Sequence, residues 1–191
     1  MDPRIFITSD LHLFHRRILE FCPKSRPFKD IDEMHYHLIQ NWNNKVSGQD
    51  NVYILGDVAF SNAKDASQFM DRLHGQKFLI RGNHDSKLVK SSDFKQRFAW
   101  IKDYYELRYN NKKFMLMHYP MMFWNNQHHG SYMLHGHMHS INPEKLNCRR
   151  WDVGMDGSSD FAPYLLDDLV SIIDNNYVEV DNVCHHGREV I

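Results

Sequence analysis

The sequence predicts an α/β fold in which parallel strands alternate with helices, followed by antiparallel strands in the second half of the chain. Three observations predict it. Short apolar runs rich in β-branched or aromatic residues recur along the chain, and amphipathic helical segments separate the first three of them. Polar side chains typical of metal ligands follow these runs directly. The loops beyond the carboxyl ends of strands form the binding crevice in open α/β sheets, so we expect these side chains to converge.

The strands that precede the candidate ligands are short apolar runs. They span residues 4–8, 52–55, 77–80, 114–117 and 132–134. The residues of ligand type that follow them are, in order, Asp10 with His12, Asp57, Asn83 with His84, His118, and His137 with His139.

Two helices are predicted between these strands. The first begins at Asp30, a residue type that caps helix N-termini, and its apolar residues recur at helical spacing until the position before Ser47. The second has its apolar residues at helical spacing from Ala63 to Leu73, and Gly75 is a typical C-terminal stop.

The second half of the chain is expected to contain mainly strands. Asn110 and Asn111 predict a hairpin turn because asparagine tolerates positive φ, and this turn would join strands at residues 100–109 and 112–117. Further strands are predicted, with little helix between them, at residues 132–135, 149–153, 170–173 and 177–180.

Length and composition predict one domain covering residues 1–191. The chain has 42% apolar residues, nine glycines and six prolines, which is enough to bury a full core. No apolar stretch approaches the roughly 18 residues needed to span a bilayer. Residues 1–4 lead into a strand without a signal-peptide pattern. We therefore expect a soluble, unsecreted protein.

The cysteines and the net charge indicate where the protein is located and which partners it can bind. Cys22, Cys148 and Cys184 fit neither a disulfide framework nor a zinc knuckle, so we expect reduced thiols and a cytoplasmic location. A formal net charge of −1 implies no attraction to nucleic acid or to an anionic membrane. We expect no membrane association and no extended nucleic-acid surface, and the sequence indicates no particular oligomeric state.

Asp10 and His12 are two residues apart at a strand end, so both side chains can leave on one side and reach one ion. A carboxylate with an imidazole suits zinc, manganese or iron(II). His137 and His139 repeat this spacing after Gly136, where glycine lets the backbone turn sharply. Taken alone, the first pair is equally consistent with a surface turn.

The remaining candidates differ in what they offer a cation. Asp57 has two carboxylate oxygens, which can bridge two ions, and Asn83 has a neutral amide oxygen, while the adjacent His84 projects elsewhere. A turn is the ordinary alternative for Gly82 with Asn83, and His118 alone would be an ordinary strand-end histidine. Seven candidate ligands after five strands nevertheless indicate a common metal centre.

The order of these motifs resembles the five sequence blocks of the calcineurin-like metallophosphoesterases. The blocks are Asp10-x-His12, Gly56-Asp57, Gly82-Asn83-His84-Asp85, His118 and Gly136-His137-x-His139, and they cover most of the chain. Residues 26–28, 33–34, 41–43 and 152–156 resemble the small bacterial and phage members of this superfamily. The Asp-Arg-Gly ending of the Ser/Thr protein phosphatases is missing after residue 56, and the chain is far shorter than theirs, so that activity is excluded.

The resemblance implies a four-layer α/β/β/α sandwich with two mixed β-sheets and a dinuclear metal site at one edge. It also assigns the ligands of the two ions: Asp10, His12 and His139 for one, Asn83, His118 and His137 for the other, and Asp57 as the bridge between them.

The implied activity is hydrolysis of a phosphoric ester by a hydroxide held between two divalent ions. Manganese is the expected metal, and iron, zinc, nickel or cobalt are alternatives. His84 would not bind metal and is the expected general acid for the leaving alkoxide. Asp85 either orients His84 or caps a helix beginning near Ser86.

Several residues near the ligands are candidates for substrate binding. His15, Arg16 and Arg17 lie within reach of a bound phosphate, and Tyr119, Phe123 and Trp124 could stack on a base or ring of the substrate. The alternative for His15, Arg16 and Arg17 is a solvated first turn of a helix, and the alternative for the aromatic residues is packing in the core or in a lid. The other histidines are expected to be structural or exposed, namely His35, His37, His74, His128, His129, His135, His185 and His186.

Three classes of function follow. The first is a metal-dependent phosphodiesterase or hydrolase of small nucleotides, because short loops at residues 14–28 and 121–130 suit small or extended substrates; a phosphomonoesterase is the alternative within this class. The second is a non-catalytic metal-binding scaffold, against which the complete ligand set argues. The third is a nucleic-acid end-processing nuclease. The basic clusters at 112–113 and 149–150 are small, so they fit a solvated surface better than a binding track for nucleic acid.

Overall fold

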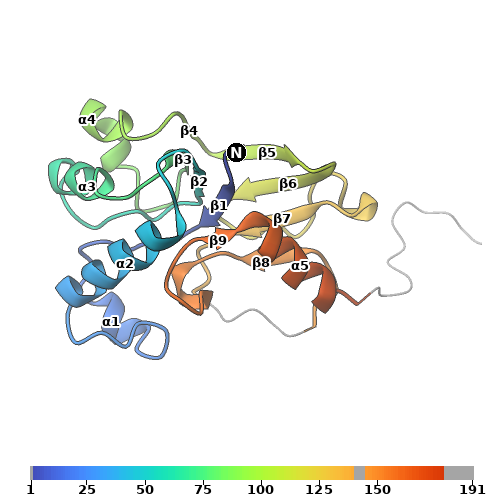
Figure 1. Ribbon diagram of the computed structural model, residues 1–191, viewed down its shortest axis with the longest axis horizontal. Coiled ribbons are helices and arrows are strands. Elements are labelled where there is room, and N and C mark those ends of the chain that lie inside the picture. The colour runs from blue at the N-terminus through green and yellow to red at the C-terminus, as the bar shows by residue number, and fades with distance from the viewer. Residues whose placement is uncertain (1, 140–144, 179–191) are drawn as a thin grey trace, which may run out of the picture.

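The computed structural model describes residues 2–139 and 145–178. They form two mixed β-sheets that pack face to face, and helices cover the outer face of the first sheet (Figure 1). The predicted α/β fold class with two mixed sheets is confirmed. Among the described helices, none combines the length and the apolar character needed to cross a bilayer.

The first sheet is largely parallel. Its strands are β1 (Ile5–Thr8), β2 (Asn51–Ile54), β3 (Gln76–Ile80), β4 (Ile101–Lys102) and β9 (Tyr164–Leu165). In space the order is β4-β3-β2-β1-β9, and within this sheet the pairing of β9 with β1 is antiparallel while the others are parallel. The carboxyl ends of β1, β2 and β3 therefore meet at one edge.

The second sheet contains β5 (Tyr104–Tyr109), β6 (Lys112–Met117), β7 (Tyr132–His135) and β8 (Arg150–Asp152), in this spatial order. β5 and β6 form the predicted hairpin, whose turn residues Asn110 and Asn111 have φ angles of 47° and 59°. The pairs β6–β7 and β7–β8 are parallel, so the prediction of antiparallel strands is wrong here. The chain makes the crossover from β6 to β7 through a loop without a long helix, which the sequence pattern did not reveal.

The single strand predicted at residues 100–109 is divided between the two sheets. β4 ends at Lys102 and β5 begins at Tyr104, so the chain changes sheets at Asp103. Asp103 forms an ion pair at the surface with Arg81, which follows β3, at 2.7 Å. Residues of high strand propensity continue on both sides of this point, so propensity alone could not place the break.

Residues of β1 show how the first sheet contributes to two cores. Phe6 packs toward the helices, whereas Ile5 and Ile7 pack toward the second sheet. This follows because successive side chains of a strand point to opposite faces. Both faces of the first sheet are therefore buried, which fixes its position between the helices and the second sheet.

The helices over the first sheet are α1 (Ile18–Phe21), α2 (Ile31–Lys45), α3 (Ala63–Met70) and α4 (Ser92–Lys95) (Figure 1). The side chain of Asp30 accepts the backbone N–H of Glu33 at 2.9 Å, which confirms the predicted N-cap of α2. α3 begins where the sequence predicts. It ends at Met70, before the predicted end at Leu73, so Gly75, with a φ of 89°, lies directly before β3 and is not the C-terminal stop of the helix.

The strand predicted at residues 170–173 is wrong, because these residues lie in α5 (Leu166–Asn176). Their β-branched side chains favour a strand locally. Leu166, Leu169 and Ile173, however, recur at helical spacing and bury one face of α5 in the core between the sheets. Burial of this face outweighs the local preference.

The strand predicted at residues 177–180 lies partly outside the described residues. Tyr177 forms an isolated parallel bridge with Leu146. Cys184, His185 and His186 also lie outside the described residues.

The outer face of the second sheet packs against the loop between β6 and β7, which contains the short helix η2 (Gln127–His129). Met115 and Met133 of this face contact Trp124. The indole N–H of Trp124 donates to the carbonyl and hydroxyl oxygens of Ser131. Trp124 therefore belongs to a core rather than to a substrate surface.

His35 of α2 is buried and structural, as expected from the sequence. Its Nε2 accepts the backbone N–H of Phe14 at 3.0 Å, and Phe14 has a left-handed φ of 63°. Burial lowers the pKa of His35 to about 4, so the imidazole stays neutral in the folded protein. Protonation would remove the lone pair that accepts this hydrogen bond.

We expect His35 to make the folded state less stable as the pH falls from about 6.5 to about 4. In this window the unfolded chain binds the proton more readily than the folded one, so stability rises with pH. His35→Gln keeps an acceptor that does not titrate, and its loss of unfolding free energy between about pH 7.5 and about pH 5 should be smaller by about 1–2 kcal/mol. Urea unfolding at both pH values measures this difference, and equal losses in the two proteins would contradict the role of His35.

Candidate metal centre

The loops after five strands bring the predicted ligands together at the edge shared by the two sheets. β1, β2 and β3 belong to the first sheet, and β6 and β7 belong to the second. The residues that follow them are Asp10 and His12 after β1, Asp57 after β2, Asn83 and His84 after β3, His118 after β6, and His137 and His139 after β7.

The backbone of these loops adopts an uncommon conformation. Positive φ angles occur at Asp10 (55°), His12 (49°), Asp57 (56°), His137 (72°) and His139 (49°). Residues other than glycine rarely adopt this left-handed conformation, which costs about 1–3 kcal/mol at each position and persists only where the surrounding structure enforces it. This left-handed backbone conformation directs the side chains toward one another directly after the strands end.

Asp10, His12 and His139 form the first group of potential ligands. Their ligand atoms lie within 4.8 Å of one another, and Nε2 of both histidines lies 3.7 Å from Oδ1 of Asp10. Oδ1 of Asp10 and Nε2 of His12 are buried and have no hydrogen-bond partner among the described residues. Such orphaned buried atoms are rare. A carboxylate oxygen and an imidazole nitrogen left in this way fit a divalent cation.

Asp57, His118 and His137 form the second group, again with ligand atoms within 4.8 Å of one another. Nε2 of His118 lies 2.9 Å from the side-chain oxygen of Asn83 and 3.6 Å from Oδ1 of Asp57. The ring of His137 is edge-on to that of His118, with the centroids 5.1 Å apart. Asn83 therefore adjoins this group and extends it by an amide oxygen.

Asp57 lies between the two groups. Its Oδ2 is 3.7 Å from Nε2 of His12, and its Oδ1 is 3.6 Å from Nε2 of His118. The side chain is almost fully buried. Each carboxylate oxygen faces a different group, which is the arrangement that a bridging carboxylate requires.

Backbone N–H groups orient both carboxylates of the site. The N–H of His137 donates to Oδ2 of Asp10 at 2.9 Å, and the N–H of His84 donates to Oδ1 of Asp57 at 3.0 Å. These bonds connect loops that are far apart in the sequence. They leave Oδ1 of Asp10 facing the first group.

The second ring nitrogens of two histidines are also held. Nδ1 of His118 lies 2.7 Å from the carbonyl oxygen of Leu55, and Nδ1 of His139 lies 2.8 Å from Oδ2 of Asp156. An Nδ1–H that donates to these oxygens leaves the lone pair on Nε2, the nitrogen that faces the carboxylates. This is the tautomer that a metal-binding histidine needs.

The electrostatics of the site favour the binding forms of His12, His137 and Asp10. Burial lowers the pKa of His12 and of His137, so these imidazoles are neutral near pH 7. Burial alone would raise the pKa of Asp10. The imidazole of His12 at 3.7 Å and the nearby imidazoles of His139 and His118 outweigh this effect and hold that pKa below its usual value. His139 differs, because burial is outweighed by the hydrogen bond with Asp156 and by the charge of Asp10, which raise its pKa.

Two buried residues to which the sequence analysis gave no role in the site support the first group. Nε and Nη2 of Arg26 donate to the two carboxylate oxygens of Asp156 at 2.9 and 2.8 Å. Arg26 also donates to the carbonyl oxygens of Asp10 and Leu11, at 2.7 and 3.2 Å. Asp156, in η3 (Met155–Gly157), is separated from Arg26 by 130 positions, so no local pattern reveals the pair.

Asp85 ties the loop after β2 to the loop after β3. It is fully buried, and its carboxylate accepts three backbone N–H groups at 2.8 to 3.0 Å, those of Gly82, Asp57 and Val58. A helix cap near Ser86 is wrong, since η1 (Leu88–Lys90) begins later, and the carboxylate bonds to backbone rather than to the ring of His84. Burial raises the pKa of Asp85, and the three donors act in the opposite direction.

Glycine is required where these loops approach each other. A Cβ at Gly82 would overlap the side chain of Asp57, and a Cβ at Gly136 would overlap Ser9 and Asp10. The loops can therefore reach their present spacing only without side chains at these two positions.

His84 lies at the rim of the site and belongs to neither ligand group. Its Nε2 is 3.9 Å from Oδ2 of Asp57, its side chain is 46% exposed, and its ring packs on Phe60 with the centroids 4.5 Å apart. It can therefore meet both solvent and a molecule bound at Asp57.

Two of the predicted substrate contacts adjoin the ligand groups. Nδ1 of His15 lies 3.0 Å from Nδ1 of His12, and its ring stacks on Phe60 with the centroids 4.0 Å apart. Burial lowers the pKa of His15 to about 4. Tyr119 is exposed, and its ring is edge-on to His137 with the centroids 4.8 Å apart.

Arg16 and Arg17 are exposed immediately before α1. The guanidinium of Arg17 lies over the ring of Phe21 and is 3.8 Å from the carboxylate of Glu20. Neither arginine reaches the ligand groups as His15 does.

The other described histidines have contacts outside the two groups. His37 stacks on Phe28, and His74 and His135 approach the carbonyl oxygens of Val46 and Gly136. Cys22 lies 3.9 Å from Nδ1 of His139, at the back of the first group.

Comparisons with known proteins place this geometry in context. The family model described as calcineurin-like phosphoesterase matches residues 3–189. The uncharacterized protein MJ1445 of Methanocaldococcus jannaschii is 34% identical over 181 residues, which cover 92% of this chain and 94% of that protein. The Gene 66 protein of Mycobacterium phage D29 is 29% identical over 186 residues, and this alignment covers 83% of this chain and 91% of that protein.

The fold is shared with a solved structure. The protein AQ665 from Aquifex aeolicus, described as of unknown function, superposes with a TM-score of 0.70 at 21% identity. The match covers 90% of this chain and the whole of that chain.

We expect Asp85→Asn to lower both stability and metal affinity. An amide NH₂ would face a backbone N–H and leave a buried donor unpaired, which costs about 1–3 kcal/mol of unfolding free energy. Asp57 would lose its fixed position, so the affinity for Mn²⁺ should fall by about tenfold or more. Urea unfolding and isothermal titration calorimetry measure these effects.

Asp93→Asn is the control for this substitution, because its carboxyl group is 53% exposed and pairs at the surface with Arg97. It should change neither quantity appreciably. Wild-type stability and Mn²⁺ affinity in Asp85→Asn would show that Asp85 does not hold the two loops.

Proposed function

The chain belongs to the calcineurin-like phosphoesterase family, and from this premise we propose that it is a metal-dependent phosphodiesterase that hydrolyses small phosphate esters such as nucleotides. The observation that carries the proposal is Asp57, whose two oxygens face two separate groups of potential ligands. Such an arrangement suits two cations rather than one.

We assign the ligands according to these groups. Asp10, His12 and His139 would hold one ion, and Asn83, His118 and His137 would hold the other, with Asp57 shared. Carboxylate, amide and imidazole donors suit manganese, iron, zinc, cobalt and nickel. The three oxygen-bearing side chains favour manganese, which we propose as the metal.

Two bound divalent ions would lower the pKa of a water molecule between them and would compensate negative charge on the phosphoryl oxygens. The protein's own contribution to the reaction then lies with His84. Its exposed ring next to Asp57 can give a proton to a leaving alkoxide, a role that typically contributes about 10²- to 10⁴-fold.

We also assign phosphate and substrate contacts around this centre. His15 and Tyr119 adjoin the ligand groups, which supports their role. Arg16 and Arg17 would serve as exposed cations that attract the phosphate from the side of α1, although Arg17 is engaged with Phe21 and Glu20.

A small substrate is favoured over a nucleic acid. Lys112 and Arg149 share the carboxylate of Asp174, and Lys113 pairs with Glu106, so carboxylates offset part of the charge of these basic clusters. The lysines also lie at the start of β6, whereas the site lies beyond its end. A scaffold without chemistry is disfavoured because His84 accompanies the full ligand set.

We further propose a cytoplasmic location. Cys22 and Cys148 are free thiols, which agrees with a reducing compartment.

Two variants test the catalytic assignment. With Mn²⁺, we expect the wild type to hydrolyse nitrophenyl diesters and dinucleotides, and we expect Asp57→Asn to lose both activities because the shared ligand is removed. His84→Ala should lower kcat by about 10²- to 10⁴-fold for dinucleotides, whose alkoxide needs a proton, and far less for esters that release nitrophenolate. Its Mn²⁺ affinity should stay that of the wild type.

His129→Ala is the control, because this histidine lies in η2, remote from the ligand groups. Turnover that survives both a chelator and Asp57→Asn would overturn the proposal. Higher activity on nitrophenyl phosphate than on any diester would identify a monoesterase instead.

A further inference from the structure

A cavity of about 1010 Å³ opens beside the first ligand group. It lies between the segment after α1, the helix α2 and the turn after η3, and its wall includes His139 and Asp156. Pockets for small organic ligands commonly have about 300–1,000 Å³. His139 borders both the ligand group and the cavity, because its Nε2 faces Asp10 and its Nδ1 faces Asp156 in the cavity wall.

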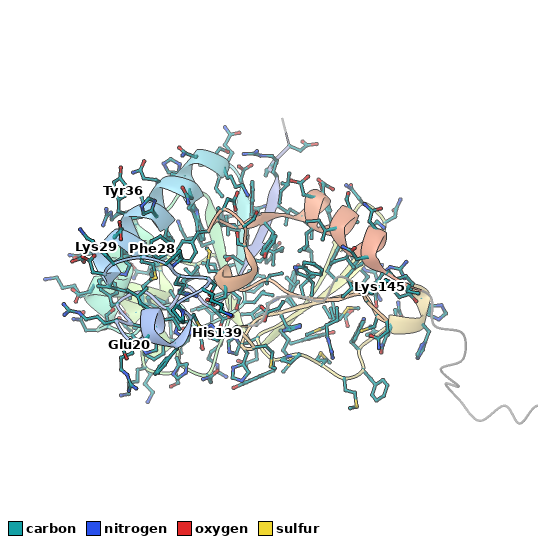
Figure 2. All side chains as sticks on the ribbon, turned by 90° about the horizontal axis from the view of Figure 1, so that it is seen from below. Glu20, Phe28, Lys29, Tyr36, His139 and Lys145 are labelled. Atoms are coloured by element: carbon teal, nitrogen blue, oxygen red, sulfur yellow. The ribbon has the colours of Figure 1, made fainter. Side chains whose placement is uncertain are left out.

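Aromatic rings form much of the wall. Phe21 lines the cavity and is 56% exposed, so its ring is accessible to a molecule bound there. Phe28 is half-buried and meets Phe161 edge-on with the centroids 4.9 Å apart. In Figure 2, Phe28 lies near α1 and α2, His139 lies closer to the middle of the molecule, and Tyr36 lies on the outer side of α2.

The polar groups of the cavity suit a flat heterocycle better than an alkyl chain. His37 stacks on Phe28, and Asn41 is oriented by a hydrogen bond from its amide to the carbonyl oxygen of Asp160 at 2.7 Å. Imidazole and amide groups can hydrogen-bond to the edge of a base while the phenyl rings contact its face.

The charges of the cavity do not oppose an anionic ligand. The carboxylate of Asp156 is neutralised by Arg26 at 2.8 Å, and that of Asp160 is paired with Lys45. Lys24 adds a cation to the lining. A phosphate ester can therefore enter without meeting an uncompensated carboxylate.

We propose that this cavity binds the nucleobase of the substrate and that Phe21 and Phe28 determine this specificity by stacking on it. The inference rests on the proposed function, because the phosphate of the same molecule would lie at the ligand groups. It assigns the substrate class as a nucleotide ester rather than a simple alkyl or sugar phosphate.

The test compares two ligands that differ only in the base. AMP and ribose phosphate are titrated into the full chain with Mn²⁺ by calorimetry, and we expect the wild type to bind AMP about 5- to 100-fold more tightly, the range for stacking of one base. Phe21→Ala and Phe28→Leu should each reduce this ratio severalfold. Phe21→Ala removes an exposed ring and Phe28→Leu keeps apolar volume, so both variants should fold.

Tyr36→Ala is the matched control, since this tyrosine is 60% exposed and lies outside the cavity lining. It should leave the ratio unchanged. Equal affinities for AMP and ribose phosphate in the wild type, or a preference that survives both phenylalanine variants, would overturn the inference. Tighter binding of a long-chain alkyl phosphate than of AMP would do the same and would indicate a lipid substrate.

Measurements of hydrolysis distinguish a failure of the cavity assignment from a failure of the proposed phosphodiesterase activity. The wild type is compared on methyl nitrophenyl phosphate and on the nitrophenyl ester of thymidine monophosphate, which share a leaving group. Turnover of both without preference for the nucleoside ester would overturn the cavity assignment and leave the phosphodiesterase intact. Base-dependent binding of AMP with no turnover of either ester would overturn the activity and support the cavity.

Discussion

The buried guanidinium of Arg26 is the interaction on which the geometry of the site depends most. It bonds to two carbonyl oxygens in the loop after β1 and to both oxygens of Asp156, which in turn holds His139. Removing one partner of such a buried pair typically costs about 3–5 kcal/mol, because the other charge stays uncompensated. One side chain thus fixes two loops that come from different sheets, and with them the spacing of the first ligand group.

The left-handed residues of these loops explain why so many fixed contacts are needed. Each strained position favours relaxation to an ordinary conformation, and five such positions occur among the potential ligands. Arg26 opposes relaxation on the side of β1, while the carboxylate of Asp85 opposes it between the loops after β2 and β3. Gly82 and Gly136 remove the side chains that would otherwise keep the loops apart.

The sequence predicted what depends on local pattern. Strand ends with polar residues, the N-cap at Asp30 and the turn at Asn110 follow from periodicity and residue type, and the structure contains them. It could not predict what depends on contacts between distant segments. Residues 170–173 are helical because burial of one face of α5 decides their conformation, and no role in the site could be predicted for Arg26 and Asp156 because they meet only after both sheets have formed.

The hydrogen bonds from the backbone of His137 and His84 to the carboxylates of Asp10 and Asp57 have a consequence for metal choice. The orientation of these carboxylates is a property of the polypeptide fold, so the cage is preorganised and does not have to be assembled around an arriving ion. Sites of oxygen and nitrogen donors bind first-row divalent ions with an affinity that rises from manganese to copper, so selection for manganese has to come from ligand type, geometry and availability. Which ion would occupy the proposed metal site then depends on metal availability as well as on the donor set.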